Sequence, residues 1–364
     1  MRIPIFRLKY DLAFREEFQR QSQRIFDEGF LTNHSFVREF EEKFARWAGA
    51  PYAVATSSGT SALETILRAV NVRNREVIVP ANTFMATATA VQNAGGIPVV
   101  VDIEPEYLSL SPRAARLRVT AKTAAIVTVH VGGMISPSVF ELQKICSDHG
   151  LALIEDCAHA HGAHLDGIPA GSFGIAGAFS FHTTKVMTTG EGGAIVCKSA
   201  SLDESLRSSR QFGCELKAPL LHRQQGGNAK MSEMHALMGL LELKRVDRRI
   251  EHRQALARRY QERLHGSSWR AFKAPASSRC PYYKQIIASP LEWTSVRDFL
   301  KSEGISLTGG VYHYPLNQQP ALGLGEVLPV ADQFSRFHIC PPCYPELELH
   351  EVDEICDQLL RLQG

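Results

Sequence analysis

Residues 179–196 read FSFHTTKVMTTGEGGAIV, in which two apolar runs flank one lysine, Lys185, and a glycine-rich loop. The apolar runs predict two buried strands, with the lysine placed where the first strand ends. A lysine at a strand end is commonly a solvent-exposed turn residue. Enzymes also place lysines there, because a partly desolvated ammonium loses its proton more easily and the free amine is a nucleophile. Both interpretations are open for this stretch taken alone.

The segments before and after Lys185 alternate between short β-branched runs and helical patterns. The expected strands are residues 52–58, 76–81, 97–103, 124–131, 151–158, 177–182 and 193–198, and the helical stretches include 60–70, 84–95 and 138–150. Several strands are almost entirely apolar, as in a parallel sheet covered on both faces. The alternation predicts an α/β fold, with a mostly parallel seven-stranded sheet flanked by helices. The short glycine-rich loop between the last two strands predicts one antiparallel neighbour.

The pattern changes near residue 228. Residues 231–265 form a charged, proline-free segment that predicts a long helix. Its apolar stripe is expected to pack in the core or between subunits, and consists of Met231, Met234, Leu237, Met238 and Leu241. The segments after it predict a smaller α+β unit. We therefore expect a large α/β domain over residues 1–240, and a long connecting helix with a small C-terminal α+β domain over residues 241–364.

The composition excludes several classes of protein. The 364 residues carry a formal net charge of +2 with both signs interspersed, and no apolar run reaches the length of a membrane span. The N-terminal stretch lacks the apolar core of a signal peptide. We therefore expect a cytoplasmic protein that binds neither nucleic acid nor membrane. The eight cysteines fit free thiols, and Cys340 and Cys343 form one isolated C-x-x-C pair, a weak zinc or redox signal.

Residues 57–66, SSGTSALETI, predict a strand end, a turn at Gly59 and a helix capped by Thr60 or Ser61. Ser61 and Glu64 have the spacing of a capping box. Backbone N–H groups and the positive end of a helix dipole would then lie beside hydroxyl groups, which suits a phosphate. The lysine-containing ending of a P-loop is missing, which disfavours ATP. A plain strand-to-helix turn is the alternative.

Residues 153–164, LIEDCAHAHGAH, place Asp156 at the end of an expected strand. Ligands collect at the carboxyl ends of the strands in open α/β sheets. A buried aspartate there needs a cationic partner. The adjacent cysteine and the histidines His159, His161 and His164 could instead bind zinc, or the histidines could be ordinary loop residues.

Together these features meet the needs of pyridoxal 5′-phosphate (PLP). This cofactor requires an anion cradle, an acid that keeps its ring nitrogen protonated, and an amine that forms a Schiff base. Asp156 suits the ring nitrogen because its negative charge raises the pKa of that nitrogen. Lys185, one strand further along the chain, supplies the amine. The combination favours the catalytic interpretation of Lys185.

The sequence resembles the DegT/DnrJ/StrS family of aminotransferases, which are fold-type I PLP enzymes that mostly act on keto sugars. The motifs that carry the resemblance, in the family's order and spacing, are SSGTSAL, VPANTFMATATAV, DIEP, IEDCAHAHGA, GSFG, FSFHTTK and GEGGAIV. The resemblance extends from residue 30 to the region of Cys340, and so covers nearly the whole chain.

The resemblance implies a role for each matched residue. Lys185 would form the Schiff base and move protons between the donor α-carbon and the cofactor, while Asp156 would pair with the ring nitrogen. Phe84 would stack on the ring, and His159 would lie near its phenolic oxygen. The phosphate would be bound by Thr60, Ser61 and Ser180, and by Asn228 of the neighbouring subunit. The last contact implies a homodimer with shared active sites.

A lysine at position 185 favours transamination, because the sugar dehydratases that resemble this family carry histidine there. We expect a ping-pong aminotransferase of amino-sugar biosynthesis. It would move an amino group from an amino acid, with L-glutamate as the expected donor, to a nucleotide-linked keto-deoxysugar or a keto-sugar acid. A PLP-dependent deoxysugar dehydratase and an aminocyclitol aminotransferase are the alternative enzymes. A cofactor-bearing binding or regulatory protein is the alternative outside enzymes.

Three segments depart from the family's pattern and leave the acceptor open. Residues 32–35 read Thr-Asn-His-Ser where a glycine-rich turn is frequent, and residues 228–230 lack the usual aromatic residue and arginine. Asn317 stands where a second histidine is common. The candidate residues of the acceptor pocket are Asn33, His313 and Tyr314.

Overall fold

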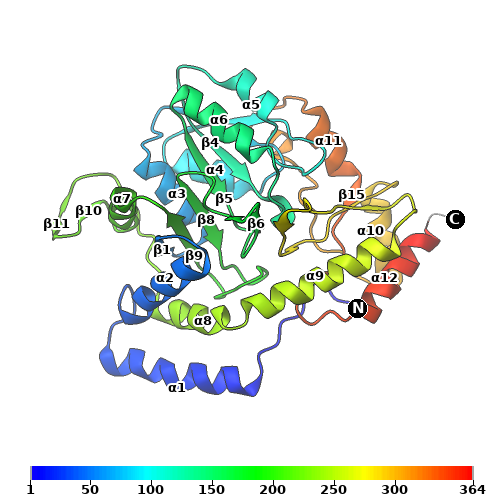
Figure 1. Ribbon diagram of the computed structural model, residues 1–364, viewed down its shortest axis with the longest axis horizontal. Helices are drawn as coiled ribbons and strands as arrows, with labels where there is room; N and C mark the ends of the chain where they lie inside the picture. Colours follow the sequence, from blue (N-terminus) through cyan, green and yellow to red (C-terminus); the bar gives the residue numbers. More distant parts are fainter. Residues whose placement is uncertain (1, 363–364) are drawn as a thin grey trace.

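The computed structural model describes residues 2–362, with a seven-stranded sheet at its centre (Figure 1). In spatial order the strands are β1 (Tyr52–Thr56), β9 (Gly193–Cys197), β8 (Ala176–Ser180), β5 (Ala152–Asp156), β4 (Thr123–Val129), β2 (Glu76–Pro80) and β3 (Ile97–Val101). All seven predicted strands are confirmed. The strands from β8 to β3 are parallel, and β9 is antiparallel to both β8 and β1, as the glycine-rich loop predicts.

Alternate residues of each strand enter separate hydrophobic cores on the two faces of the sheet. In β2, Ile78 packs in the first core, whereas Val77 and Val79 pack in the second. Side chains of α1 (Leu12–Glu28), α2 (Ser35–Trp47), α5 (Pro112–Arg118), α6 (Val139–His149) and α8 (Glu233–Leu243) join the first core. Those of α3 (Gly59–Ala69), α4 (Met85–Asn93) and α7 (Ala200–Arg210) join the second. Burial on both faces accounts for the continuous apolar runs in the sequence.

A third core forms in the C-terminal part of the chain. Its helices are α9 (Val246–Arg263), α10 (Trp293–Ser302) and α12 (Leu349–Arg361), beside a small antiparallel sheet of β12 (Arg270–Ala271), β14 (Ile287–Ala288) and β15 (His338–Ile339). Ile3 packs in the same core and bridges Ile305, so the N-terminal segment lies beside α12 (Figure 1). The division at residue 240 stays a prediction.

Smaller elements connect and extend these parts. A three-stranded sheet of β13 (Ser278–Arg279), β6 (His164–Leu165) and β7 (Ile168–Pro169) links the C-terminal part to the loop after β5. α11 (Pro329–Arg336) contributes to the second core. The hairpin of β10 (Cys214–Glu215) and β11 (Ala218–His222) extends away from the sheet (Figure 1).

The segment expected as one long helix forms two helices. α8 ends at Leu243 and α9 begins at Val246. α8 packs on α1 and α2, whereas α9 packs on α12. The prediction of a single helix is therefore wrong. The start of α9, with Val246 and Ile250, still packs in the first core beside α8, and the later part of α9, with Leu256 and Tyr260, packs in the third core. Neither proline nor glycine lies between the two helices. The Met and Leu stripe packs in the first core, as predicted.

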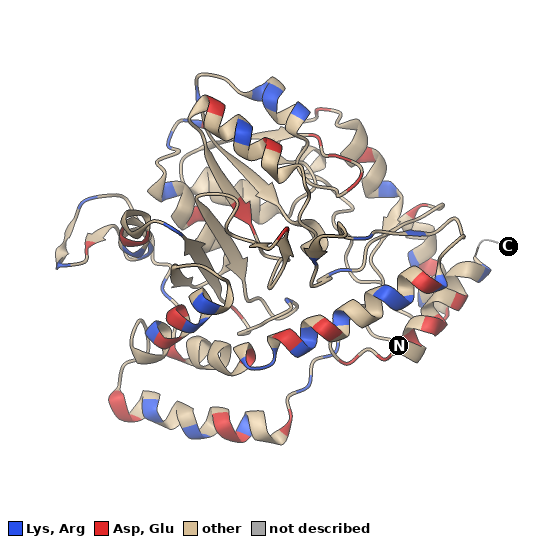
Figure 2. Ribbon diagram, viewed as in Figure 1, with Lys and Arg blue, Asp and Glu red and all other residues tan. Residues whose placement is uncertain are grey.

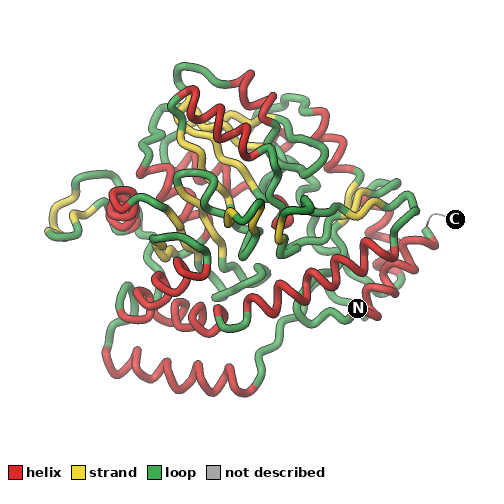
Figure 3. Tube along the Cα trace, in the orientation of Figure 1, coloured by secondary structure: helices red, strands yellow, loops and turns green. Residues whose placement is uncertain are grey.

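Charged residues of both signs alternate along the outer helices, most clearly on α9 and α12 (Figure 2). Within residues 2–362, no helix has both the length and the apolar character that a bilayer span requires. Long loop segments lie between the central sheet and the small C-terminal strands (Figure 3). These loops form much of the site described next.

Candidate active site

A cavity of about 440 Å³ lies at the carboxyl ends of the central strands. Its wall combines the start of α3 (residues 58–60), Asp156 at the end of β5, Ser180 at the end of β8, Lys185 in the following loop, and residues 283–284 and 309–312 of the C-terminal part. Open α/β sheets bind their ligands at this edge. The structure therefore brings the three predicted groups, the helix start, the carboxylate and the lysine, to one cavity.

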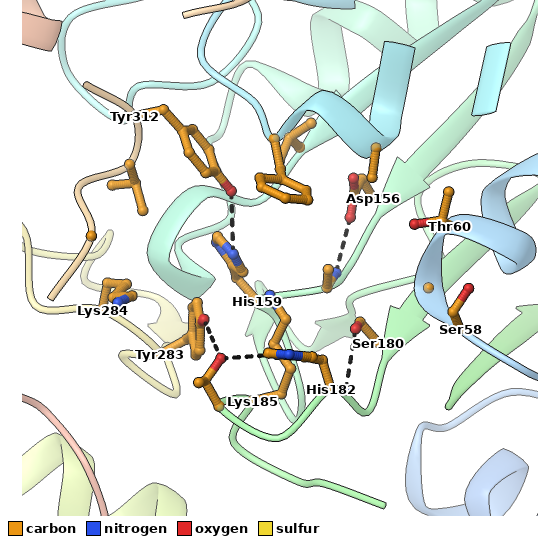
Figure 4. A pocket seen from close by; sticks show the side chains of 18 of the residues that line it. Ser58, Thr60, Asp156, His159, Ser180, His182, Lys185, Tyr283, Lys284 and Tyr312 are labelled. Carbon is orange, nitrogen blue, oxygen red and sulfur yellow. Dashed lines mark hydrogen bonds between the residues drawn. The ribbon is translucent and has the colours of Figure 1, made fainter. Parts of the chain in front are cut away.

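Lys185 lies in the loop between β8 and β9, and its Nζ atom is 4.4 Å from the centre of the Tyr283 ring. The Tyr283 hydroxyl is 3.0 Å from Oγ1 of Thr184, so the ring is fixed to the residue that precedes the lysine (Figure 4). Burial raises the pKa of Tyr283, but the positive charges of Lys185 and Lys284, together with the hydrogen bond to Thr184 and the charge of Arg253, lower this pKa to about 8. The lysine amine is thus held over an aromatic face beside the cavity.

Asp156 is nearly buried at the end of β5, and both of its oxygens are hydrogen-bonded. The hydroxyl of Thr87 donates to Oδ2 at 3.0 Å, and the backbone N–H of Ala158 donates to Oδ1 at 3.1 Å. Burial raises the pKa of Asp156, while these two hydrogen bonds and the charge of Lys185 oppose the increase. A protonated ring nitrogen would supply the cationic partner that a buried carboxylate requires.

Ser58 caps α3, rather than Thr60 or Ser61 as predicted. Its hydroxyl accepts the N–H of Ser61 at 3.0 Å, and the Ser61 hydroxyl accepts the N–H of Ser58 at 2.9 Å. The backbone of Ser58 is extended, whereas Thr60 already belongs to the helix. The predicted box of Ser61 and Glu64 is therefore wrong, and Glu64 instead pairs with an arginine one turn later.

The start of α3 forms a cradle that fits a phosphate. A Cβ at Gly59 would lie 2.7 Å from Cβ of Ser180, so glycine is needed for α3 to approach β8 this closely. Ser58, Thr60 and Ser180 gather at the same end of the cavity (Figure 4). The first N–H groups of a helix have no intrahelical partners, so an anion here meets N–H groups, hydroxyls and the helix dipole.

His159 lies between two tyrosines of the cavity wall. Its ring centre is 4.3 Å from that of Tyr283. The N–H of Gly132 donates to Nδ1 at 3.3 Å, which leaves the proton on Nε2 to face the hydroxyl of Tyr312 at 3.4 Å. Burial, followed by the charges of the neighbouring lysines, lowers the pKa of His159 well below its ordinary value. The imidazole is therefore neutral, in one defined tautomer.

The other predicted residues differ in their distance from the cavity. Phe84 lines it with a largely exposed side chain, and its ring centre is 6.2 Å from that of Tyr312. Ser61 does not line it, because its hydroxyl is used in the capping box. The roles given to these side chains stay predictions.

Asn33, Asn228, His313 and Tyr314 also lie outside the cavity wall of the single chain. The Asn33 side chain donates to Gln211 at 3.2 Å. Asn228 accepts a hydrogen bond from the lysine two residues later. His313 stacks on a tryptophan with ring centres 3.9 Å apart, and Tyr314 is exposed to solvent. Their roles toward a substrate or a partner subunit stay predictions.

The residues of the site that sequence reasoning missed include Ser58, Thr87, Tyr283, Lys284 and Tyr312. Ser58 carried a usable signal, since a serine three residues before another serine at a helix start has the spacing of a cap. Thr87 lies within the VPANTFMATATAV stretch and supports Asp156, and Tyr312 directly precedes the predicted His313. Tyr283 and Lys284 carry no local motif, and tertiary packing alone brings them to the cavity.

Potential metal ligands meet at a different place from the predicted histidine cluster. Within the described part of the chain, such a group consists of His130, Glu155 and Cys157. The Glu155 carboxylate accepts three backbone N–H groups from residues 171–174, at 2.7 to 2.8 Å, and lies 2.9 Å from Nε2 of His130. Both oxygens of Glu155 already accept hydrogen bonds, so we interpret the three residues as a structural anchor for the loop of residues 171–174 and not as a metal site. All eight cysteines are free and buried, Cys340 and Cys343 included.

A phosphate cradle, a buried carboxylate and a lysine around one cavity define the class of PLP-dependent enzymes, here on a fold-type I architecture. Residues 13–360 match the model of the DegT/DnrJ/EryC1/StrS aminotransferase family. The chain belongs to this family and is an aminotransferase, as the resemblance predicts.

Two relatives and one solved structure illustrate the match. The chain is 30% identical to the GDP-perosamine synthase of Vibrio cholerae, over 91% of this chain and 92% of that protein. It is 34% identical to the L-glutamine:scyllo-inosose aminotransferase of Streptomyces griseus, over 79% of this chain and 71% of that protein. The structure of S. venezuelae DesV in complex with a ketimine intermediate matches with a TM-score of 0.92 and 29% identity, over 99% of this chain and 98% of that chain. The relatives include sugar and aminocyclitol aminotransferases, which supports a role in amino-sugar biosynthesis.

Proposed function

We propose that this enzyme transfers an amino group from L-glutamate to a keto sugar by a ping-pong mechanism. The observation that carries the proposal is the convergence of Lys185, Asp156 and the start of α3 on one cavity. The acceptor is a nucleotide-linked keto-deoxysugar or a keto-sugar acid. Similarity to enzymes that act on sugars supports this acceptor class.

The cavity wall fits PLP. Ser58, Thr60, Ser180 and the N–H groups of α3 would hold its phosphate, with Ser61 fixing the helix start. Asp156 would hold the ring nitrogen, and Phe84 and His159 would contact the ring. When bound, PLP supplies an electron sink that stabilises negative charge on the carbon bearing the amino group.

Lys185 is the residue that moves the proton. Its Nζ accepts a proton from the α-carbon of the amino donor in the first half-reaction, and returns a proton to the acceptor carbon in the second. The ring of Tyr283 orients this amine, and Thr184 fixes the ring. Asp156, fixed by the hydrogen bonds that it accepts from Thr87 and Ala158, would place its carboxylate beside the ring nitrogen.

A homodimer is the proposed working unit. The hairpin of β10 and β11 exposes Leu220 almost completely, and Leu221 substantially, which fits a surface that another copy covers. Asn228 at the base of this hairpin would then complete the phosphate site of the partner, and Asn33, His313 and Tyr314 would contribute to the acceptor pocket. We also place the enzyme in the cytoplasm, because its eight cysteines are free thiols.

An aminocyclitol aminotransferase is the second candidate. The relative from Streptomyces griseus carries scyllo-inosose in its name and is 34% identical to this chain. A sugar dehydratase is less favoured, because the lysine at position 185 supports transamination.

The test is to incubate the PLP-loaded enzyme with L-glutamate and a panel of acceptors. The panel contains nucleotide-linked keto-deoxysugars, keto-sugar acids and scyllo-inosose, and mass spectrometry detects 2-oxoglutarate and aminated products. An aminated sugar formed with 2-oxoglutarate supports the proposal, and an aminated cyclitol favours the second candidate. Loss of water from a sugar without 2-oxoglutarate would contradict both. The Lys185→Ala variant should form no product.

A further inference from the structure

Lys284 is a positively charged residue of the cavity wall to which the mechanism above gives no role. It precedes β14, next to Tyr283, and its side chain is half-buried. Its Nζ atom is 5.4 Å from the centre of the Tyr283 ring. Figure 4 shows it across the cavity from Ser58, Thr60 and Ser180, so it lies apart from the phosphate cradle.

The ammonium of Lys284 has no counter-ion in the described chain. Among residues 2–362, no carboxylate forms an ion pair with it within 4.0 Å. The two carboxylates of the wall are directed elsewhere, since Asp156 accepts from Thr87 and Ala158, and Glu191 lies 4.0 Å from the imidazole of His182. A half-buried cation without a partner gains from an anionic ligand, because the loss of its hydration is then compensated.

The charge of Lys284 acts on the centre of the cavity. Burial and the charge of Lys185, followed by that of Lys284, lower the pKa of His159. The same two lysine charges lower the pKa of Tyr283 against the effect of burial. An anion that enters the cavity is therefore attracted toward this wall as well as toward the catalytic lysine.

The amino donor carries anionic groups that suit Lys284. Every α-amino acid carries a carboxylate on the reacting carbon, and L-glutamate carries a second one on its side chain. In the proposed function, Lys185 acts on the reacting carbon and the start of α3 binds the phosphate. Lys284 is the other lysine of the cavity wall, and the proposed function gives it no anionic partner. We propose that Lys284 binds a carboxylate of the amino donor in the first half-reaction. This inference rests on the proposed function.

The experiment compares PLP-loaded wild type with Lys284→Gln, Lys284→Arg and Lys273→Gln. Lys273 is an exposed residue of the same part of the chain, so its substitution removes an equal charge outside the cavity. Titration with PLP, followed by absorption, reports cofactor affinity, and single-turnover loss of the visible band reports the reaction with L-glutamate. For Lys284→Gln we expect PLP affinity within about twofold of wild type. The L-glutamate concentration for half-maximal rate should rise about 10- to 100-fold, with a smaller change in maximal rate.

Lys284→Arg should retain most of the donor affinity, and Lys273→Gln should match wild type. Two further donors identify which carboxylate is bound. L-Glutamine keeps the α-carboxylate, whereas isoglutamine keeps only the side-chain carboxylate. If Lys284 binds the α-carboxylate, Lys284→Gln weakens the reaction with L-glutamine as it does with L-glutamate. If it binds the side-chain carboxylate, the reaction of L-glutamine is insensitive to the substitution and that of isoglutamine is weakened.

Two results would overturn the role of Lys284 while leaving the proposed function intact. One is that wild type and Lys284→Gln both react with L-glutamate and need the same L-glutamate concentration for half-maximal rate. The other is a variant that loses PLP affinity, which would assign Lys284 to the cofactor. A wild type that binds PLP but reacts with none of the three donors would instead contradict the proposed donor reaction, and the role of Lys284 with it.

Discussion

The Nζ atom of Lys185 lies 4.4 Å from the centre of the Tyr283 ring, and the two residues come from different parts of the chain. Lys185 follows β8 of the central sheet, whereas Tyr283 precedes β14 of the C-terminal part. The hydroxyl of Tyr283 is anchored on Thr184, beside the lysine. Packing of the C-terminal part against the sheet therefore sets the position of the Lys185 amine.

Replacing Tyr283 by phenylalanine tests this positioning. The ring stays but its hydrogen bond with Thr184 is lost, so we expect kcat to fall about 5- to 10-fold with little change in the donor KM. Tyr283→Leu also removes the aromatic face and should lower kcat further. Steady-state kinetics and PLP titration separate this effect from cofactor loss. Equal kcat values for wild type and Tyr283→Phe would show that the hydroxyl does not position Lys185.

The lowered pKa of Tyr283 predicts a titration in the cofactor-free protein. Ultraviolet difference absorbance should show one tyrosine ionising near pH 8, and Tyr283→Phe should remove that transition. The ordinary pKa of tyrosine is about 10, so the folded state releases this proton more readily than the unfolded state. The stabilisation is complete above about pH 10 and is lost as the pH falls through 8.

Urea denaturation at several pH values checks the sign of this linkage. The stability of wild type relative to Tyr283→Phe should rise between pH 8 and about pH 10. A difference that is constant over this interval would mean that Tyr283 has an ordinary pKa in the folded protein.

Gly59→Ala tests the phosphate cradle. The added Cβ would lie 2.7 Å from Cβ of Ser180, so α3 and β8 must separate. We expect PLP affinity to fall at least about tenfold and the free energy of unfolding to fall by about 1–3 kcal/mol. Gly227→Ala is the matched control, because its nearest neighbouring atom would be 3.8 Å away. Unchanged PLP binding in Gly59→Ala would contradict the placement of the phosphate.

Glu155→Ala tests the anchor beneath the site. Three backbone N–H groups of residues 171–174 lose their acceptor in a buried region. We expect a loss of about 3 kcal/mol or more in the free energy of unfolding, measured by chemical denaturation. Glu141→Ala removes an exposed carboxylate paired with Arg116 and should change stability by about 1 kcal/mol or less. Similar losses in the two variants would argue against the anchoring role.

The sequence predicted the central sheet because most of its strands are buried on both faces. Val77, Ile78 and Val79 show the reason, since alternate side chains enter opposite cores and all must be apolar. Asp156 and Lys185 could be predicted because they end or follow such strands, where a polar residue stands out against apolar neighbours. These local patterns were sufficient for the core of the candidate site.

Features that depend on distant contacts could not be predicted in this way. Tyr283 and Lys284 lie in a stretch without a motif, and the packing of the C-terminal part brings them to the cavity. The break between α8 and α9 has no local signal, because neither proline nor glycine lies between Leu243 and Val246, and only the later part of α9 reaches the third core. The cap at Ser58 is different, because it is a local feature that the spacing of Ser58 and Ser61 signals, and it was missed because several neighbouring hydroxyl residues could serve as the cap.

The most direct test of the central claim is the absorption spectrum of the PLP-loaded enzyme before and after addition of L-glutamate. A band near about 410–430 nm should be lost as a band near about 330 nm grows, because the amino group passes to the cofactor. Lys185→Ala should lack this change. The absence of a visible band after reconstitution with PLP would contradict the role of Lys185. A visible band that does not change on addition of L-glutamate would contradict the assignment of L-glutamate as the amino donor.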